Sequence, residues 1–157
     1  GEKMPINGMH HAAISTPNIE RLMNFYKENL NCKDIGSRSQ WEKGVNEIDQ
    51  VLGLRGSSAK QGFLSCGNVM IEFFEYSSPE PKPIEENRPV NNHGHTHVCF
   101  DVTNIDEVYN DLVSKGVRFH CPPQDFGSVI ATYGRDIDGN VFEIQEIIAQ
   151  NHPAKVF

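Results

Sequence analysis

The amino-acid sequence predicts a mixed α+β fold built from two similar halves, because one order of elements occurs twice: a strand, a helix, and then further strands. The same spacing separates a strand histidine from a helix isoleucine in both halves: His11 and Ile19, His97 and Ile105. Later in each half a Gly-Asn pair leads into a strand that carries a glutamate, Glu72 or Glu143. The repetition predicts two modules with the same architecture.

In the first half, "HHAAIST" (10–16) predicts a short buried strand. The stretch "TPNIERLMNFYKENL" (16–30) predicts a helix with Thr16 and Pro17 as its cap and first turn. Its apolar residues recur at helical spacing: Ile19, Leu22, Met23 and Tyr26. "GNVMIEFFEY" (67–76) predicts a strand entered through a turn, whereas the Gly-rich residues 41–63 are interpreted as a flexible flap.

The second half follows a linker at residues 77–92, where four prolines exclude a regular element. "HTHVCFDV" (95–102) predicts a strand. "TNIDEVYNDLVSKG" (103–116) predicts a helix that Gly116 ends. The helix stripe consists of Ile105, Val108, Tyr109, Leu112 and Val113. "DIDGNVFEIQEI" (136–147) predicts a turn and a final strand.

The composition narrows the classes of partner. The 157 residues carry a formal net charge of −7, from 21 acidic and 14 basic residues, and contain no basic run. Nucleic acid and anionic membranes are therefore excluded as partners, and a small-molecule substrate is expected. No stretch predicts a membrane span, and the first residues lack the features of a secretory leader, so a cytoplasmic location is expected.

The four cysteines have spacings that fit neither a zinc ribbon nor a redox pair, so we expect reduced, buried thiols: Cys32, Cys66, Cys99 and Cys121. A group of aromatic residues could line an apolar pocket or belong to the core: Trp41, Phe63, Phe74, Phe100 and Tyr133.

The paired histidines and glutamates are the candidate functional residues. In the strand after Gly67, alternation places Glu72 and Glu75 on opposite faces, so one carboxylate points toward the covered side. A buried carboxylate needs a partner, which a metal ion can supply. Two imidazoles and two carboxylates would form a neutral shell for Zn, Ni, Co, Mn or ferrous Fe. The histidines without a counterpart in the other half are interpreted as flanking residues: His10, His93, His95, His120 and His152.

Four segments in order resemble the glyoxalase, bleomycin-resistance and extradiol dioxygenase superfamily, also called the vicinal oxygen chelate superfamily: "HAAISTPNIERLMNFYKENL", "NVMIEFFEY", "HVCFDVTNIDEVYNDLVSKGV" and "DIDGNVFEIQE". The resemblance implies a single domain of two tandem βαβββ modules, about 8–76 and 93–148, whose curved mixed sheet surrounds a metal cleft. It implies a homodimer. It also implies a divalent metal ion held by four residues: His11, Glu72, His97 and Glu143.

For the activity, the resemblance implies a metal-dependent lyase or isomerase similar to glyoxalase I, in which Glu72 or Glu143 is the catalytic base that moves a proton. The substrate would chelate the ion through adjacent oxygens and react through an enediolate or enolate. Ser15 stands where glyoxalase I enzymes of the human type carry an arginine, which argues against glutathione. "IEFFEYSSPEP" (71–81) is similar to a strand of methylmalonyl-CoA epimerase, although no cationic site for CoA phosphates is evident.

Two alternatives remain open. An extradiol dioxygenase would hold ferrous iron on His11, His97 and Glu143. "YGRDIDGNVFE" (133–143) resembles the final motif of that class, although Ile137 replaces a proline and "PPQDF" replaces the expected catalytic histidine. A resistance protein that sequesters a ligand needs no metal shell, and the four-residue set argues against it.

Overall fold

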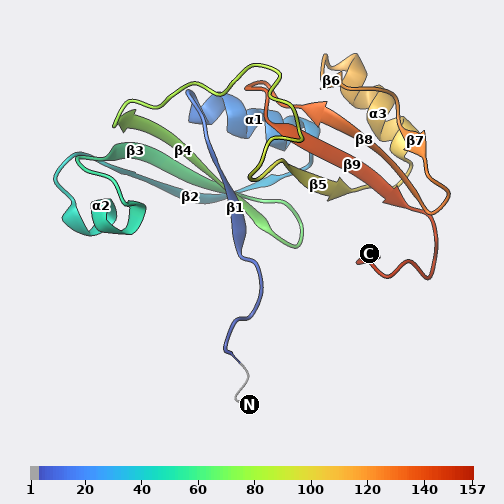
Figure 1. The fold of residues 1–157 in the computed structure, drawn as a ribbon, viewed down its shortest axis with the longest axis horizontal. Coiled ribbons are helices and arrows are strands. Elements are labelled where there is room, and N and C mark those ends of the chain that lie inside the picture. Colours follow the sequence, from blue (N-terminus) through green and yellow to red (C-terminus); the bar gives the residue numbers. More distant parts are fainter. Residues whose placement is uncertain (1–3) are drawn as a thin grey trace. The chain divides into compact units, whose positions relative to one another are not determined.

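A computed structural model describes residues 4–157, which divide into two compact units with the boundary between Lys82 and Pro83. The boundary lies within the linker predicted at residues 77–92. Each unit contains its own mixed sheet. Along the chain of each unit, a helix follows the first strand and precedes the other strands (Figure 1). The predicted α+β class is confirmed. The two predicted modules correspond to two mixed sheets, one in each unit.

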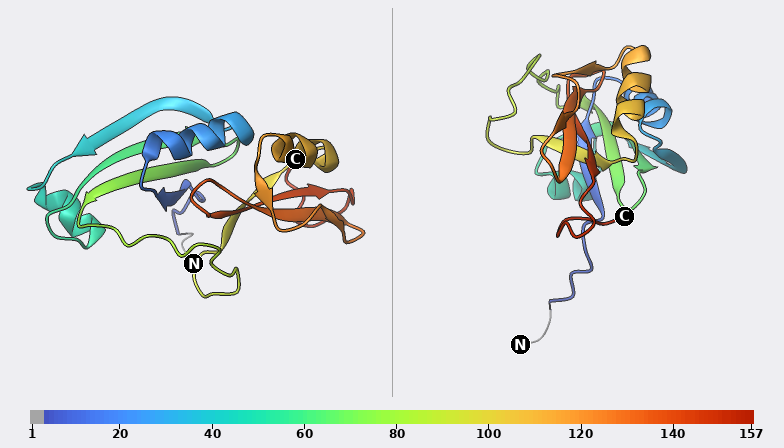
Figure 2. Two further views of the ribbon diagram at one scale, coloured as in Figure 1. Left: turned by 90° about the horizontal axis from the view of Figure 1, so that it is seen from above. Right: turned by 90° about the vertical axis from the view of Figure 1, so that its right-hand side faces the viewer.

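The first unit contains β1 (His11–Ser15), α1 (Ile19–Asn29), β2 (Lys33–Trp41), α2 (Asn46–Leu52), β3 (Ser58–Ser65) and β4 (Met70–Ser78). The strand order is β1-β4-β3-β2, and β1 pairs with β4 in parallel whereas the other pairs are antiparallel. The helix α1 packs against β3 and β4 (Figure 2, left). Leu22, Tyr26 and Phe73 are fully buried in this core.

The second unit contains β5 (His97–Asp101), α3 (Ile105–Ser114), β6 (Arg118–Phe119), β7 (Gln124–Asp125), β8 (Val129–Arg135) and β9 (Val141–Ile147). The order β5-β9-β8-β6 repeats that of the first unit, and β7 also pairs with β8. The helix α3 packs against β9, where Leu112 and Phe142 are buried. Gly116 follows this helix with a φ of +86°, a conformation that favours glycine, so the predicted stop is confirmed.

The predicted start of α1 is wrong by two residues. The backbone N–H of Thr16 donates to the carbonyl of Phe74 (2.8 Å), so Thr16 still belongs to the pairing of β1 with β4. Asn18 is the N-cap, and its side chain accepts from the backbone N–H of Arg21 (3.0 Å). Asn, like Thr, is a favoured capping residue, and the strand pairing decides between them.

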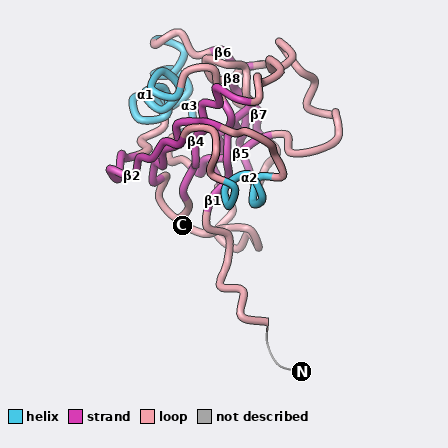
Figure 3. Tube along the Cα trace, turned by 90° about the vertical axis from the view of Figure 1, so that its left-hand side faces the viewer, coloured by secondary structure: helices cyan, strands magenta, loops and turns pink. Residues whose placement is uncertain are grey.

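The flexible flap predicted at residues 41–63 is also wrong. The segment contains α2 and most of β3, and β3 lies inside the sheet between β2 and β4 (Figure 3, where α2 is a short cyan segment). The Asp49 carboxylate accepts from the backbone N–H groups of Gly56 (2.8 Å) and Ser57 (2.9 Å), which ties α2 to the start of β3. Gly44, Gly53 and Gly56 have a positive φ and lie outside the regular elements, whereas Gly62 is part of β3.

The expectation of four reduced, buried cysteines is wrong. Cys32 and Cys66 form a disulfide, whereas Cys99 and Cys121 are free and exposed. Lys33 pairs with Ser65 at the end of the β2–β3 ladder, so the next residues outward are the two bonded cysteines. The pairing of β2 with β3 therefore brings together two cysteines that are 34 positions apart in the sequence.

In each unit a glutamate on a strand accepts a hydrogen bond from the backbone at the N-terminus of a helix. In the first, the Glu75 carboxylate on β4 accepts from the backbone N–H of Ile19 (2.8 Å). In the second, the Glu146 carboxylate on β9 accepts from the backbone N–H groups of Ile105 (2.9 Å) and Asn104 (3.2 Å). A negative charge at a helix N-terminus satisfies free N–H groups and interacts favourably with the helix dipole.

We expect Glu75→Gln and Glu146→Gln each to lower the free energy of unfolding by about 1 kcal/mol, because a neutral amide replaces a charged acceptor at the helix N-terminus. Urea unfolding followed by circular dichroism measures the change. Glu28→Gln is the matched control, since Glu28 is an exposed residue near the other end of α1. A loss in the control as large as in the two variants would contradict the capping role.

Candidate metal centre

The first unit brings one predicted pair of ligands together. His11 lies on β1 and Glu72 on β4, and the His11 Nε2 is 2.9 Å from the Glu72 Oε2. The parallel register pairs His11 with Met70 and Ala13 with Glu72, so the two side chains are diagonal neighbours on one face. Only 8% of the Glu72 surface is exposed, which makes it a buried carboxylate of the kind that needs a partner.

The second unit repeats this arrangement. His97 lies on β5 and Glu143 on β9, and the His97 Nε2 is 3.0 Å from the Glu143 Oε2. His97 pairs with Val141 and Cys99 with Glu143, which is the same diagonal relation as in the first unit. Each predicted His-Glu pair is thus formed within its unit, on the face opposite to the capping glutamate.

A half-buried amide contacts the Glu72 carboxylate, and a hydroxyl contacts that amide. The Gln61 side chain on β3 donates from its Nε2 to the Glu72 Oε1, and the Ser39 hydroxyl on β2 donates to the Gln61 Oε1 (2.5 Å). Both Glu72 oxygens therefore have partners, His11 on one side and Gln61 on the other. The sequence analysis did not find Gln61 or Ser39, because neither has a recognisable spacing and only the register of β2, β3 and β4 aligns them.

The second pair has different neighbours. The Thr96 hydroxyl lies 2.8 Å from the His97 Nδ1, and the Tyr133 hydroxyl lies 3.4 Å from the His97 Nε2. Burial, followed by the Glu143 charge, raises the pKa of Tyr133, so this phenol stays protonated at neutral pH. The first pair thus has the Gln61 amide as a neighbour, and the second pair has the Tyr133 phenol.

Cys99 is the residue directly opposite Glu143 on the neighbouring strand. Although Cys99 is exposed at the surface, protein atoms around its thiol desolvate it, and this raises the pKa of Cys99 well above its usual range. The second cause is the negative charge of Glu143. The reactivity of the Cys99 thiol therefore depends on the charge of the neighbouring Glu143 carboxylate.

Two of the histidines interpreted as flanking residues lie beside the pairs. The His10 Nδ1 is 2.8 Å from the His11 Nδ1. The His120 ring centroid is 6.1 Å from that of Tyr133, and its Nε2 accepts a hydrogen bond from the Arg135 Nε (3.1 Å). Burial, and then the charge of Arg135, lowers the pKa of His120, which keeps this ring neutral. His120 has no counterpart in the first half, so the repeat could not identify it.

The atoms of each pair fit a divalent cation. Two ligands that are each about 2.1 Å from an ion, at right angles, are separated by about 3.0 Å. The two N···O distances are 2.9 and 3.0 Å. An ordinary hydrogen bond has the same length, so the distance does not by itself indicate a metal. The chemistry of the two side chains is the stronger observation, because a neutral imidazole and a carboxylate suit first-row metals. Within residues 4–157 no group of three or more His, Cys, Asp or Glu side chains is placed to hold a metal ion, and each pair offers two donor atoms.

Comparisons with known proteins agree with the fold. The family model described as the Glyoxalase/Bleomycin resistance protein/Dioxygenase superfamily matches residues 8–144. The chain is 25% identical over 149 residues to the mitochondrial methylmalonyl-CoA epimerase of Dictyostelium discoideum, covering 92% of this chain and 81% of that protein. The human mitochondrial methylmalonyl-CoA epimerase is 24% identical over 153 residues, covering 93% of this chain and 77% of that protein.

Two solved structures share the fold. A glyoxalase family protein from Bacillus cereus has a TM-score of 0.82 at 21% identity, with 95% of this chain and 99% of that chain covered. A variant of the genomically encoded fosfomycin resistance protein from Listeria monocytogenes, solved with Mn(II) and a dihydroxypropylphosphonic acid, has a TM-score of 0.58 at 18% identity. Its alignment covers 88% of this chain and 91% of that chain.

We expect Glu143→Gln to speed alkylation of Cys99 by iodoacetamide at pH 8.5 by about threefold or more, because loss of the negative charge lowers the pKa of the thiol and raises the thiolate fraction. Mass spectrometry of the metal-free protein measures the rate at each cysteine. Cys121 in the same molecule is the internal control and should keep its rate. An unchanged or slower rate at Cys99 would show that the two side chains are not neighbours.

Proposed function

Because the chain belongs to the Glyoxalase/Bleomycin resistance protein/Dioxygenase superfamily, we propose that it is a metal-dependent isomerase or lyase that moves a proton on the carbon beside a carbonyl group. The observation that carries this proposal is the pair of matching His-Glu contacts, one in each unit. The similarity to methylmalonyl-CoA epimerases over most of the chain favours isomerase chemistry.

The proposed ligands are the four predicted residues: His11, Glu72, His97 and Glu143. Each unit would contribute one imidazole and one carboxylate, so that a divalent Ni, Zn, Co, Mn or Fe ion would have a neutral protein shell. The Mn(II) bound by the Listeria protein supports a divalent ion in this superfamily. The ion would supply a Lewis acid that stabilises negative charge on a substrate oxygen.

The surroundings of the two carboxylates favour different roles. Both oxygens of Glu72 are held, one by His11 and one by Gln61, which suits a fixed ligand. Glu143 has the Cys99 thiol, a weak donor, where Glu72 has the amide, and this leaves it freer to move. Glu143 is therefore proposed to take the proton from carbon and return it, while the protonated Tyr133 beside His97 donates a hydrogen bond to a substrate oxygen.

One observation favours the dioxygenase as a second candidate. Tyr133 lies beside His97, and the neutral His120 lies beside Tyr133, so an aromatic acid-base group and a second imidazole adjoin the pair. A ferrous ion on His11, His97 and Glu143 would leave positions for oxygen and a catechol. The support of Glu72 by Gln61 and His11 argues for the four-ligand isomerase, because a three-ligand site has no use for it.

Several expectations remain predictions: a small-molecule substrate, a homodimer, and a cytoplasmic location. The net charge of −7 supports the absence of a nucleic-acid partner. Within residues 4–157, none of the helices combines the length and the apolar character that a bilayer crossing requires. The Cys32–Cys66 disulfide is a bond of a kind that is rare in cytosolic proteins.

For the metal, we expect His97→Ala to remove most of the bound ion and Glu72→Gln to weaken its affinity by more than about tenfold. His95→Ala is the matched control, since His95 is exposed and lies two positions from His97 in the same segment. Elemental analysis of protein purified without chelator measures the content. Equal metal in His97→Ala and His95→Ala would contradict the ligand assignment, and iron retained in Glu72→Gln would favour the dioxygenase.

For the reaction, protein loaded in turn with each candidate metal is incubated in D2O with racemic methylmalonyl-CoA, with the hemithioacetal of methylglyoxal and glutathione, and with hydroxyacetone. We expect proton NMR to show enzyme-dependent exchange at the carbon beside the carbonyl, slowed at least about 100-fold in Glu143→Gln. No exchange on any carbonyl compound, together with oxygen uptake on a catechol, would replace the isomerase by the dioxygenase.

A further inference from the structure

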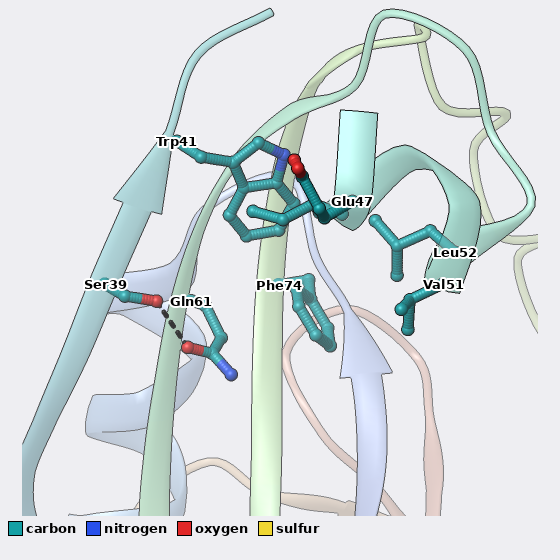
Figure 4. A pocket seen from close by; sticks show the side chains of 8 residues that line it. Ser39, Trp41, Glu47, Val51, Leu52, Gln61 and Phe74 are labelled. Carbon is teal, nitrogen blue, oxygen red and sulfur yellow. Dashed lines mark hydrogen bonds between the residues drawn. The ribbon is translucent and has the colours of Figure 1, made fainter. Parts of the chain in front are cut away.

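We propose that the substrate carries an uncharged apolar group, aryl or branched alkyl, which binds in a pocket of the first unit beside the His11-Glu72 pair. The inference rests on the proposed function, because it makes this pocket the part of the active site that selects the substrate. The pocket has a volume of about 370 Å³ and lies between α2 and the β2–β3–β4 face (Figure 4). It is lined by Ser39, Trp41, Glu47, Ile48, Val51, Leu52, Gln61 and Phe74.

The floor of the pocket is a cluster of aromatic rings. Trp41 and Phe74 pack edge to face with ring centroids 6.2 Å apart, and Phe74 stacks on Tyr76 at 5.5 Å. Phe74 and Glu72 are two positions apart on β4, so both side chains lie on the same face of the sheet. The aromatic floor is therefore a continuation of the surface that carries the carboxylate.

The opposite wall is the apolar side of α2. Val51 and Leu52 project from α2 toward Phe74 (Figure 4), yet no residue of α2 is buried and Val51 is 87% exposed. The helix is nevertheless held in place, because Asp49 binds the start of β3 and the Trp41 indole N–H donates to the Ser57 hydroxyl (3.0 Å). An apolar wall fixed opposite aromatic rings, with open space between, is suited to an apolar occupant.

Gln61 connects the pocket to the metal ligands. Its side chain lines the pocket and donates to the Glu72 carboxylate, so a group bound against Trp41 and Phe74 lies one side chain away from that carboxylate. The charges of the lining residues restrict the occupant further. Glu47 is the one charged side chain among them, so no cation is present to bind a carboxylate or a phosphate. The lining therefore disfavours an anion, which distinguishes the occupant from the carboxylate and phosphate ends of glutathione and CoA, and its mainly apolar side chains favour an uncharged group.

Trp41 makes binding directly observable, since it is the only tryptophan in the chain. Metal-free protein is titrated with cyclohexylmethanol and with cyclohexanecarboxylate, which have the same ring and differ in charge. The expected result is a saturable shift of Trp41 emission to shorter wavelength, with the alcohol bound at least about fivefold more tightly than the carboxylate. A response without saturation, or equal affinity for the two probes, would overturn the pocket.

Two matched substitutions test the location. Val51→Glu places a carboxylate at the pocket and is expected to weaken binding of the alcohol at least about fivefold. Val113→Glu makes the same change at an exposed position near the end of α3 and should leave binding unchanged. Both valines are partly or largely exposed, so neither change creates a core cavity. Equal weakening in both variants would assign the effect to net charge and overturn the location.

A second measurement separates this inference from the proposed function. In metal-loaded protein, 2-hydroxyacetophenone and hydroxyacetone carry the same pair of adjacent oxygens but differ in the apolar group. Proton exchange in D2O should have a kcat/KM at least about tenfold higher for the aryl ketone, and Val51→Glu should reduce that ratio. Equal exchange of both ketones would overturn the pocket and leave the function. Trp41 binding without exchange of either ketone would leave the pocket and overturn the function.

Discussion

The parallel pairing of the first and last strand of each unit determines both the site and the packing around it. Since side chains alternate along a strand, the register that aligns His11 with Met70 puts Glu72 diagonally beside that histidine and turns Glu75 to the other face. The second unit has the same register, with Glu146 at the start of α3. One backbone arrangement thus turns one glutamate toward the strand histidine and makes another glutamate, three positions later, a helix cap.

The sequence predicted the parts of this arrangement that repeat. The equal spacing of His11 and His97 from their helices, and of Glu72 and Glu143 from their turns, identified the pairs that the structure brings together. The α1 and α3 helices followed from apolar residues at helical spacing, which Leu22 and Leu112 confirm by their burial. These features could be predicted because the same residue pattern occurs in both halves of the sequence.

Other parts depend on contacts between distant segments. The strand β2 has exposed residues along most of its length, so it has no alternating pattern, and α2 is too short and too exposed to show a stripe. Gln61 contacts Glu72 only because β3 lies beside β4, and Cys32 meets Cys66 only because β2 lies beside β3. His120 reaches Tyr133 across the β6–β8 edge, which no spacing within the chain indicates.

The Cys32–Cys66 disulfide would hold the chain together after a cut between these two cysteines. Cys32 and Cys66 enclose β2, α2 and β3, which carry the Trp41 ring and the apolar wall opposite Phe74. Residues 42–45 between β2 and α2 are exposed, as protease-sensitive turns commonly are. A single cut there leaves both fragments joined through sulfur, and release of either one requires a reductant. Proteolysis and reduction are therefore coupled events in this segment.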